Sequence, residues 1–505
     1  MSRLPQNSSS HSKTACLLGA VLFFSFIYFY EGGGWNQNSR FDLVRAIVER
    51  HTLSTDAYYQ NTEDRAYVRG HYYSDKAPGL VFFSLPFAFA ARPAMRMFGV
   101  NPASPQGAMV LSYVVGAGAS ALPGALAGVC LFFLGLRVGG EIRGAAFAAV
   151  ALGLGSPFWA YASLFWAHAL TGACLIFAFA FALKLRESHP WGQDFLWALG
   201  VGLAAGWATV TEYPAFPASV LLGLLALAEA WPRGRSARWQ VVLGVGLGAS
   251  LCLLVLATYL YAVFGSFTPG YAYLDSKQFT FMQQRGFLGL TYPHPDRLLK
   301  LLFGCSRGLF LASPVMIAAP IGLWLWYKRG SSPAAALVAT AIPAYYFLFN
   351  ASFYWWKSGL SFGPRYAGAS FPFLCLGLAV VWPRASEAWR RVLAVVGLIS
   401  VFIALMMVST TSQLSMQDPC PFLHSSWPAF WKGHMALNRV SMLTVLEAGT
   451  SPQSGAVNLG QVIGLAGLAS LLPLLAAWAL GILIWIRIQP SSTKAPETKM
   501  QKPAV

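Results

Sequence analysis

Long apolar runs are the feature of this sequence that most constrains its fold. Two of them, Val241–Phe264 and Ile463–Ile486, contain no charged residue. Each reaches the roughly 20 residues that a helix needs to cross about 30 Å of hydrocarbon. Charged residues make up only 10% of the chain, against about 25% in soluble domains, so lipid must cover most of its surface. The sequence therefore predicts an all-α polytopic membrane protein.

Apolar segments of this kind recur along the whole chain, and we expect about 12 to 13 membrane helices between residues 15 and 488. The segments lie near 15–31, 79–98, 109–136, 144–158, 163–183, 195–211, 214–231, 241–264, 308–327, 334–351, 366–382, 390–408 and 462–488. Residues 1–14 are expected to be a cytoplasmic N-terminus before an uncleaved first helix. Residues 489–505 are polar and rich in lysine and proline, and this composition predicts a disordered tail.

Short basic links between the segments predict the orientation. They lie at 137–143, 184–186, 233–238, 328–329, 384–391 and 487. The positive-inside rule places these links in the cytoplasm, so the opposite segment ends face outward. The outward stretches are 32–77, 156–168, 211–214, 259–307 (with the loop at 265–307), 350–366 and 410–461. A full crossing by 79–98 would put residue 137 on the wrong side, so this segment, with Pro86 and Pro93, is expected to be re-entrant or half-spanning.

The net charge of +17 does not indicate a nucleic-acid partner, because the basic residues are scattered in these links. Such residues can also contact anionic headgroups, so membrane lipids are the expected partner. Five of the seven cysteines lie inside apolar runs, where a thiol acts as a small apolar group. Cys305 and Cys420 lie in polar stretches and could pair.

The first outward loop, 32–77, is unusually acidic. Seven of the 18 acidic residues of the chain lie between 31 and 75. Residues 38–50 show helical spacing of apolar side chains and predict an amphipathic helix capped by Asn38 or Ser39. Such a helix lies in the membrane interface, as a simple strut or as part of a site. A long ordered loop is usually functional.

Asp75 and Lys76 place a carboxylate next to an ammonium where the chain re-enters the membrane. They stand in the stretch Gly70-His71-Tyr72-Tyr73-Ser74-Asp75-Lys76-Ala77-Pro78-Gly79. Lys76 can hold a phosphate as a point charge. The alternative is a surface ion pair followed by a turn.

These motifs together resemble the GT-C glycosyltransferases, in particular the branch of protein O-mannosyltransferases and lipid A aminoarabinose transferases. The resemblance covers residues 15–190 in order and spacing, and the remainder more loosely. It rests on the helix after the first membrane segment and on a Tyr-Tyr-x-x-Lys-x-Pro-like re-entry that contains Tyr72, Tyr73 and Lys76. The resemblance implies a GT-C-like core in a bacterial inner (plasma) membrane. It also implies that a sugar passes from a polyprenyl-phosphate carrier to a hydroxyl group on the outer face.

The chain departs from the family pattern at the first-loop acids. The family has an acidic pair before an Arg-aromatic dipeptide, whereas here Gln37-Asn38-Ser39 precedes Arg40-Phe41. Asp42, one helical turn on from Asn38, is the nearest substitute for the catalytic acid. A second family acid follows a Ser-Pro-aromatic stretch. Here Ser156-Pro157-Phe158 matches, and His168 stands where that acid is expected.

Other polar residues near segment ends complete the predicted site, because ionisable groups in apolar surroundings are functional suspects. Glu212, beside Pro214, is a third candidate acid, or a turn residue. Arg365 and Arg307 lie in glycine-containing outer loops and suit a phosphate, which arginine binds through a bidentate fork. Trp356 and Tyr366 suit the apolar face of a sugar, or form an aromatic belt at the interface.

The predicted function is a membrane glycosyltransferase. Asp42, Asp75 and Glu212 are the expected catalytic acids, and Lys76, Arg365 and Arg307 the expected donor-phosphate ligands. The expected substrate-binding residues are Tyr72, Tyr73, His168, Trp356 and Tyr366. The acceptor is a lipid, a glycan or a protein. A divalent metal ion held by carboxylates and His168 is left open, since no spacing requires it. The alternatives are a transporter or flippase of lipid-linked saccharide, and a non-catalytic binder.

Overall fold

The computed structural model describes residues 8–190, 192–330, 332–443 and 455–488. The predicted tail 489–505 and part of the loop 410–461 lie outside the described residues. Helices dominate the fold, as the sequence predicts. Helix α1 (Ser8–Ile27) starts within the stretch expected to be the cytoplasmic N-terminus, because the polar residues 8–14 continue the helix that the apolar residues require.

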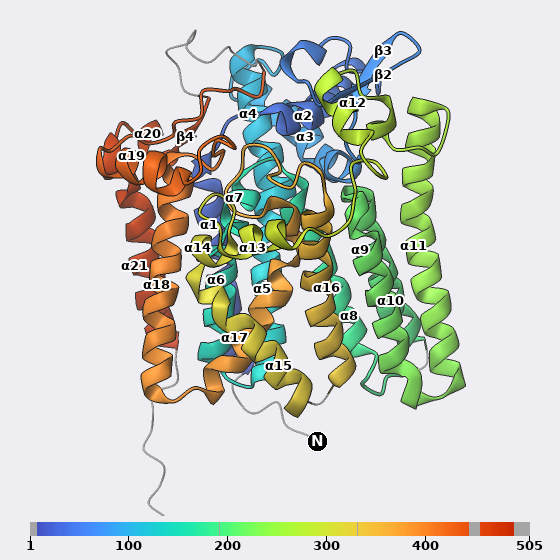
Figure 1. Cartoon of the computed structure of the whole chain (residues 1–505), viewed down its shortest axis with the longest axis vertical. Coiled ribbons are helices and arrows are strands. Elements are labelled where there is room, and N and C mark those ends of the chain that lie inside the picture. The colour runs from blue at the N-terminus through green and yellow to red at the C-terminus, as the bar shows by residue number, and fades with distance from the viewer. Residues whose placement is uncertain (1–7, 191, 331, 444–454, 489–505) are drawn as a thin grey trace, which may run out of the picture.

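Ten helices in the described part are long and apolar enough to cross a membrane. They are α1, the continuous α4–η2–α5 (Pro105–Gly139), α8 (Ala167–Lys184), α9 (Gln193–Thr211), η3–α10–η4 (Tyr213–Arg233), α11 (Arg235–Phe264), α16 (Pro333–Ser352), η7–α17 (Arg365–Arg384), α18 (Glu387–Thr410) and η9–α21 (Gly467–Ile488). In Figure 1 these helices run along the long axis, with α9–α11 at one edge and α18 and α21 at the other.

Two further apolar segments form interrupted helices. One consists of α6 (Ile142–Gly153) and α7 (Phe158–Ser163), and the other of α14 (Leu309–Ala312), η6 (Pro314–Ala318) and α15 (Ala319–Arg329). Breaks at Pro157 and Pro314 shorten the individual helices, because proline lacks the backbone donor that a continuous helix needs.

The segment expected to be re-entrant or half-spanning forms helix α3 (Gly79–Met97). Gly79 lies against Thr211 at the end of α9. On the next helix, Tyr113 Oη donates to the carbonyl oxygen of Ile27 at the end of α1, at 2.8 Å. Gly79 and Tyr113 thus both lie where α9 and α1 end, so the chain between them, which includes α3, does not cross the bundle. The basic links fall at the opposite end of the bundle (Figure 1).

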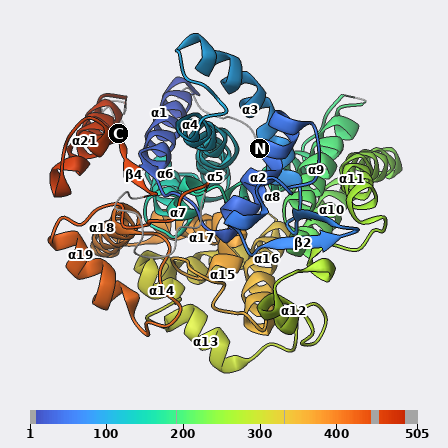
Figure 2. The same cartoon turned by 90° about the horizontal axis from the view of Figure 1, so that it is seen from above.

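The end opposite the basic links carries the long loops, and we call it the loop-rich end. It holds α2 (Trp35–Arg50) and the hairpin of β2 (Arg65–Val68) and β3 (His71–Ser74). It also holds α12 (Lys277–Gln283), α13 (Pro295–Phe303), α19 (Trp427–Trp431) and α20 (Leu459–Val462). Figure 1 shows several of these elements at the top, and Figure 2 looks onto them from above.

Helix α2 differs in two ways from the helix predicted at 38–50. It starts at Trp35 with Gly34 at the N-cap, so the predicted capping by Asn38 or Ser39 is wrong. The side chains of both residues make tertiary contacts instead, Asn38 with the carbonyl oxygen of Asn61 (2.9 Å) and Ser39 with Ser74 (2.9 Å). The second difference is burial. Most of α2 is buried, and Figure 2 places it near the middle of the loop-rich end.

The two ends of the described chain pack together. Strand β1 (Phe29–Tyr30) follows α1 and pairs antiparallel with β4 (Val457–Asn458), which precedes α20. Deeper in the bundle, Trp478 Nε1 of α21 donates to Ser25 Oγ of α1 at 2.9 Å. Helix α21 is therefore fixed to the first helix as well as to its own loops.

Candidate active site

A buried trio of charges forms the centre of the candidate site. Lys76 Nζ lies 2.8 Å from Asp75 Oδ2 and 2.9 Å from Asp64 Oδ2. Burial alone would lower the pKa of Lys76, but the two carboxylates outweigh it and raise that pKa. Lys76 therefore stays protonated. Asp75 and Lys76 form an ion pair, as in the alternative reading of the sequence, but the pair is buried rather than on the surface and includes a second carboxylate, Asp64.

A histidine–carboxylate pair lies beside this trio. His168 Nδ1, in the first turn of α8, is 2.6 Å from Glu212 Oε1, at the end of α9. Each helix end fixes one partner, because α8 begins at Ala167 and α9 ends at Thr211. The side chain of Glu212 is 16% exposed, whereas that of Asp75 is 2% exposed. Glu212 is thus the more accessible of the two acids.

Arg365 presents a cation that no carboxylate neutralises. Its guanidinium lies 4.7 Å from the centre of the Trp166 ring and 5.4 Å from that of Tyr366. Its Nε is buried without a hydrogen-bond partner, and within the described ranges no carboxylate lies within 4 Å of it. The two rings hold the flat guanidinium by cation–π contact while its N–H groups stay available for an anion.

Arg40 is a second buried arginine without an ion-pair partner among the described residues. Its Nη1 donates to the carbonyl oxygen and the side-chain oxygen of Asn36, and its Nε has no partner. Burial lowers the pKa of the guanidinium, although Tyr271, Glu212 and both acids of the trio oppose this effect. An arginine in a protein nonetheless remains charged.

These groups converge from elements far apart in the sequence. The Trp166 ring joins His168 to Arg365, because it lies 5.8 Å from the His168 ring and 4.7 Å from the Arg365 guanidinium. The ring of Tyr271 lies 5.5 Å from Lys76 Nζ. We call this set the charge cluster: Arg40, Asp64, Asp75, Lys76, His168, Glu212, Tyr271, Arg365 and Tyr366. Of the predicted site residues, it contains Asp75, Lys76, His168, Glu212, Arg365 and Tyr366.

The structure places the predicted acid Asp42 outside the charge cluster. Its Oδ1 accepts a hydrogen bond from Asn61 Nδ2 at 2.9 Å, and its Oδ2 is buried without a partner. Burial raises the pKa of Asp42 well above its usual value. This carboxyl group therefore lies between α2 and the loop that contains Asn61, with one oxygen bonded to Asn61.

The predicted phosphate ligand Arg307 is committed to backbone carbonyl oxygens. Its guanidinium donates to Ser306, Lys357, Gly359 and Leu414 at 2.9–3.2 Å. Four such bonds use most of its N–H groups. Arg307 thus contacts the loop before Arg365 rather than the cluster itself.

The three remaining predicted aromatic residues also lie elsewhere. Tyr72 stacks on Tyr59 of the hairpin region at 4.0 Å, and Tyr73 packs against Phe264 at the end of α11. The Trp356 ring lies 5.9 Å from both Lys300 Nζ and Lys357 Nζ. As sugar-binding residues these three stay predictions without a contact to the cluster.

Sequence reasoning missed three members of the cluster: Arg40, Asp64 and Tyr271. Asp64 lies in the acid-rich loop, and Arg40 in the Arg-aromatic dipeptide, so both carried a signal. Tyr271 lies in a long loop and carried none. Within the described residues, no group of three or more histidine, cysteine or acidic side chains is arranged to hold a metal ion.

Comparison with known proteins gives similarity of fold alone. No family model matches the chain, and no curated protein matches it. ArnT from Cupriavidus metallidurans in the apo state is similar over 94% of this chain and 75% of its own, with 16% identity and a TM-score of 0.48. The same protein bound to undecaprenyl phosphate is similar over 94% of this chain and 76% of its own, with 14% identity and a TM-score of 0.48.

The archaeal oligosaccharyltransferase AglB from Archaeoglobus fulgidus, in complex with an inhibitory peptide and a dolichol-phosphate, is similar over 88% of this chain and 61% of its own. Its identity is 14% and its TM-score 0.46.

Proposed function

We propose that the chain is a GT-C-type membrane glycosyltransferase that moves a sugar from a polyprenyl-phosphate donor to a hydroxyl acceptor at the outer face of the membrane. The observation that carries this proposal is the charge cluster. It brings arginines without carboxylate partners together with accessible and buried carboxylates at one end of an apolar bundle. Anion binding and proton abstraction are the two tasks that such a transfer requires.

The donor phosphate is assigned to Arg365 and Arg40. As the bond between the anomeric carbon and the phosphate oxygen breaks, its electron pair stays on that oxygen, and positive charge there stabilises the leaving polyprenyl phosphate. Both arginines lack an ion pair among the described residues, whereas Lys76 is already neutralised by two carboxylates. Lys76 supports this site chiefly by keeping Asp64 and Asp75 in place.

Glu212 is the proposed base. It takes the proton of the acceptor hydroxyl as the acceptor oxygen forms its bond to the anomeric carbon. Its exposure and its contact with His168 at 2.6 Å favour it over Asp75, whose Oδ2 is held by Lys76. A carboxylate in reach of the reacting hydroxyl is the usual form of such a base. Asp75 is the second candidate.

Two features support an outer-face site in a bacterial inner membrane. The basic links lie at the end opposite the cluster, and basic links are cytoplasmic by the positive-inside rule. The loop-rich end also contains a disulfide between Cys305 and Cys420, and disulfides persist in oxidising compartments. The acceptor class, whether lipid, glycan or protein, is left open by these features.

The test is release of polyprenyl phosphate from a polyprenyl-phosphate sugar by the purified protein. Glu212→Gln and Arg365→Gln are expected to lower turnover by about 100-fold or more, as the loss of a base or of a charge-stabilising donor does. Asp56→Asn and Arg285→Gln are matched controls outside the cluster. Asp56 also accepts from a histidine, His71, at 2.7 Å, and Arg285 also lies over an aromatic ring, that of Phe281.

Equal turnover in all four variants would refute the assigned site. Binding and movement of the intact donor without release of polyprenyl phosphate would instead identify a transporter or flippase. Transporters usually bind their substrate near the bilayer midplane, whereas this cluster lies at the helix ends.

A further inference from the structure

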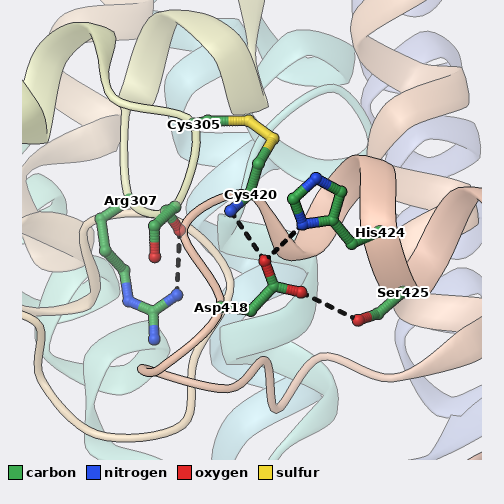
Figure 3. Close-up of a disulfide and its surroundings, with 7 residues drawn as sticks. Cys305, Arg307, Asp418, Cys420, His424 and Ser425 are labelled. Carbon is green, nitrogen blue, oxygen red and sulfur yellow. Dashed lines mark hydrogen bonds and ion pairs between the residues drawn. A yellow bond between two sulfur atoms is a disulfide. The ribbon is translucent and has the colours of Figure 1, made fainter.

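A disulfide and the hydrogen bonds of one arginine join three loops next to the charge cluster: the loops that contain Cys305, Gly359 and Cys420. Cys305, after α13, forms a disulfide with Cys420, in the segment between α18 and α19. Figure 3 shows this disulfide together with Arg307 and Asp418. Asp418 shapes the turn that presents Cys420, because its Oδ1 accepts from the Cys420 backbone N–H and from His424 Nδ1, each at 2.8 Å.

Arg307, two residues after Cys305, connects the same loops through hydrogen bonds. It is a fully buried side chain, 1% exposed, without a carboxylate partner in the described part of the chain. Its Nη2 donates to the carbonyl oxygen of Leu414 at 3.2 Å and to that of Gly359 at 2.9 Å. Leu414 belongs to the segment that the disulfide anchors, and Gly359 belongs to the loop that precedes Arg365. We call the disulfide and the Arg307 guanidinium together the clasp.

The loop before Arg365, residues 353–364, depends on such external contacts for its shape. Ser358, Gly359 and Gly363 have positive φ angles. The backbone of Ser358 is strained in this conformation because the residue carries a Cβ atom. Lys357 Nζ donates to the carbonyl oxygen of Met416 at 3.0 Å, which ties the loop to the segment of Cys420. At its far end, Tyr161 Oη donates to the carbonyl oxygen of Phe362 at 2.6 Å.

We propose that the clasp is a positioning device for the donor-phosphate site: the Cys305–Cys420 disulfide and Arg307 hold residues 357–364, and through them they aim the Arg365 guanidinium at the cluster. The proposal rests on the proposed function for the role of Arg365. It changes the role of Arg307 from a phosphate ligand to a positioning residue that acts through Arg365. Opening the disulfide is then expected to weaken donor binding while the helices stay folded.

The first experiment measures the loop directly and does not depend on activity. Hydrogen–deuterium exchange of the protein in detergent is followed with and without a reductant, and in Cys305→Ser. The amides of 357–364 are expected to exchange faster when the disulfide is absent, whereas those of α16 and α17 stay protected. Faster exchange confined to 304–308 and 414–424 would overturn the proposal. Cys16→Ser, at an exposed free cysteine, is the control for the substitution itself.

The second experiment measures binding of farnesyl phosphate, a detergent-soluble lipid phosphate. Arg365→Gln is expected to raise its Kd about 10- to 100-fold, since charge-assisted hydrogen bonds are lost. Cys305→Ser, reductant-treated protein and Arg307→Met are expected to raise it about 3- to 10-fold, since the guanidinium is kept but less well aimed. Arg307→Lys keeps one or two of the carbonyl contacts and is expected to recover part of the affinity.

The outcomes separate the two proposals. Weak binding by Arg365→Gln with unchanged binding by the clasp variants would overturn the clasp and leave the proposed function in place. Unchanged binding by Arg365→Gln would overturn the phosphate role of Arg365, and with it this part of the proposed function, while hydrogen exchange still decides whether the clasp holds the loop.

Discussion

Replacing Lys76 by methionine is the sharpest test of the buried trio, because the lysine is the only cation within 4 Å of Asp64 and Asp75 in the described part of the chain. Methionine fills similar space without charge. The substitution leaves two carboxylates without a counter-ion, in side chains that are 12% and 2% exposed.

The expected loss follows from this burial. Removing one partner of a buried ion pair costs about 3–5 kcal/mol, because the other charge is left uncompensated. Lys300→Met is the matched control. Lys300 Nζ is 3.1 Å from Asp296 Oδ2, but these side chains are 58% and 62% exposed, and such surface pairs contribute about 1 kcal/mol or less.

The assay is equilibrium unfolding in mixed detergent micelles with increasing SDS, read by tryptophan fluorescence at neutral pH. The pKa of Lys76 is raised above the unfolded value of about 10.5. Its contribution is therefore complete at neutral pH and is lost only as the pH rises through the higher folded value. Adding Asp64→Asn and Asp75→Asn to Lys76→Met is expected to recover part of the stability, because no buried charge then remains unpaired. A loss no larger than that of Lys300→Met would refute the reasoning.

Two further predictions concern stability away from the cluster. Burial raises the pKa of Glu31 to about 8, although the Ser412 backbone N–H opposes this. Between the unfolded value of about 4.5 and the folded value, only the folded state keeps this proton. Stability therefore falls as pH rises through this window, and Glu31→Gln is expected to remove that fall in thermal unfolding at pH 5 and pH 8; an unchanged pH profile would contradict it. Gly322→Ala would place a Cβ atom on the carbonyl oxygen of Gly377 and is expected to cost about 1–3 kcal/mol; wild-type stability in the same SDS titration would show that α15 and α17 can separate freely.

The membrane helices could be predicted from sequence because a single physical requirement, about 20 apolar residues, marks each of them. The same requirement explains where the prediction was ambiguous. Residues 79–98 are apolar enough for a membrane segment, but α3 buries one face against α2, α4 and α9 and remains at the loop-rich end. Apolar composition indicates that a segment is buried, but it does not distinguish burial in lipid from burial against other parts of the protein.

The charge cluster was predictable in its location and less so in its membership. Acid density marked residues 31–75, and the cluster does draw Asp64 and Asp75 from this loop. Helical spacing made Asp42 the substitute acid, but the fold turns that face of α2 toward Asn61. The pairing of His168 with Glu212 joins residues on neighbouring helices, and no local pattern carries that information.

Arg307 and Arg365 illustrate what decides between a binding and a structural arginine. Both stand in glycine-containing loops at the loop-rich end, and both were predicted to bind the donor phosphate. In the structure, four carbonyl oxygens satisfy Arg307, and moving any one of the three loops would leave a buried cation short of acceptors, which is costly. Arg365 has rings against it and an Nε without a partner, so an arriving phosphate gains hydrogen bonds without displacing existing ones. Arg307, whose hydrogen bonds are made, is therefore held in place, whereas Arg365 has N–H groups free to bind an anion. For this reason Arg307 is suited to position Arg365.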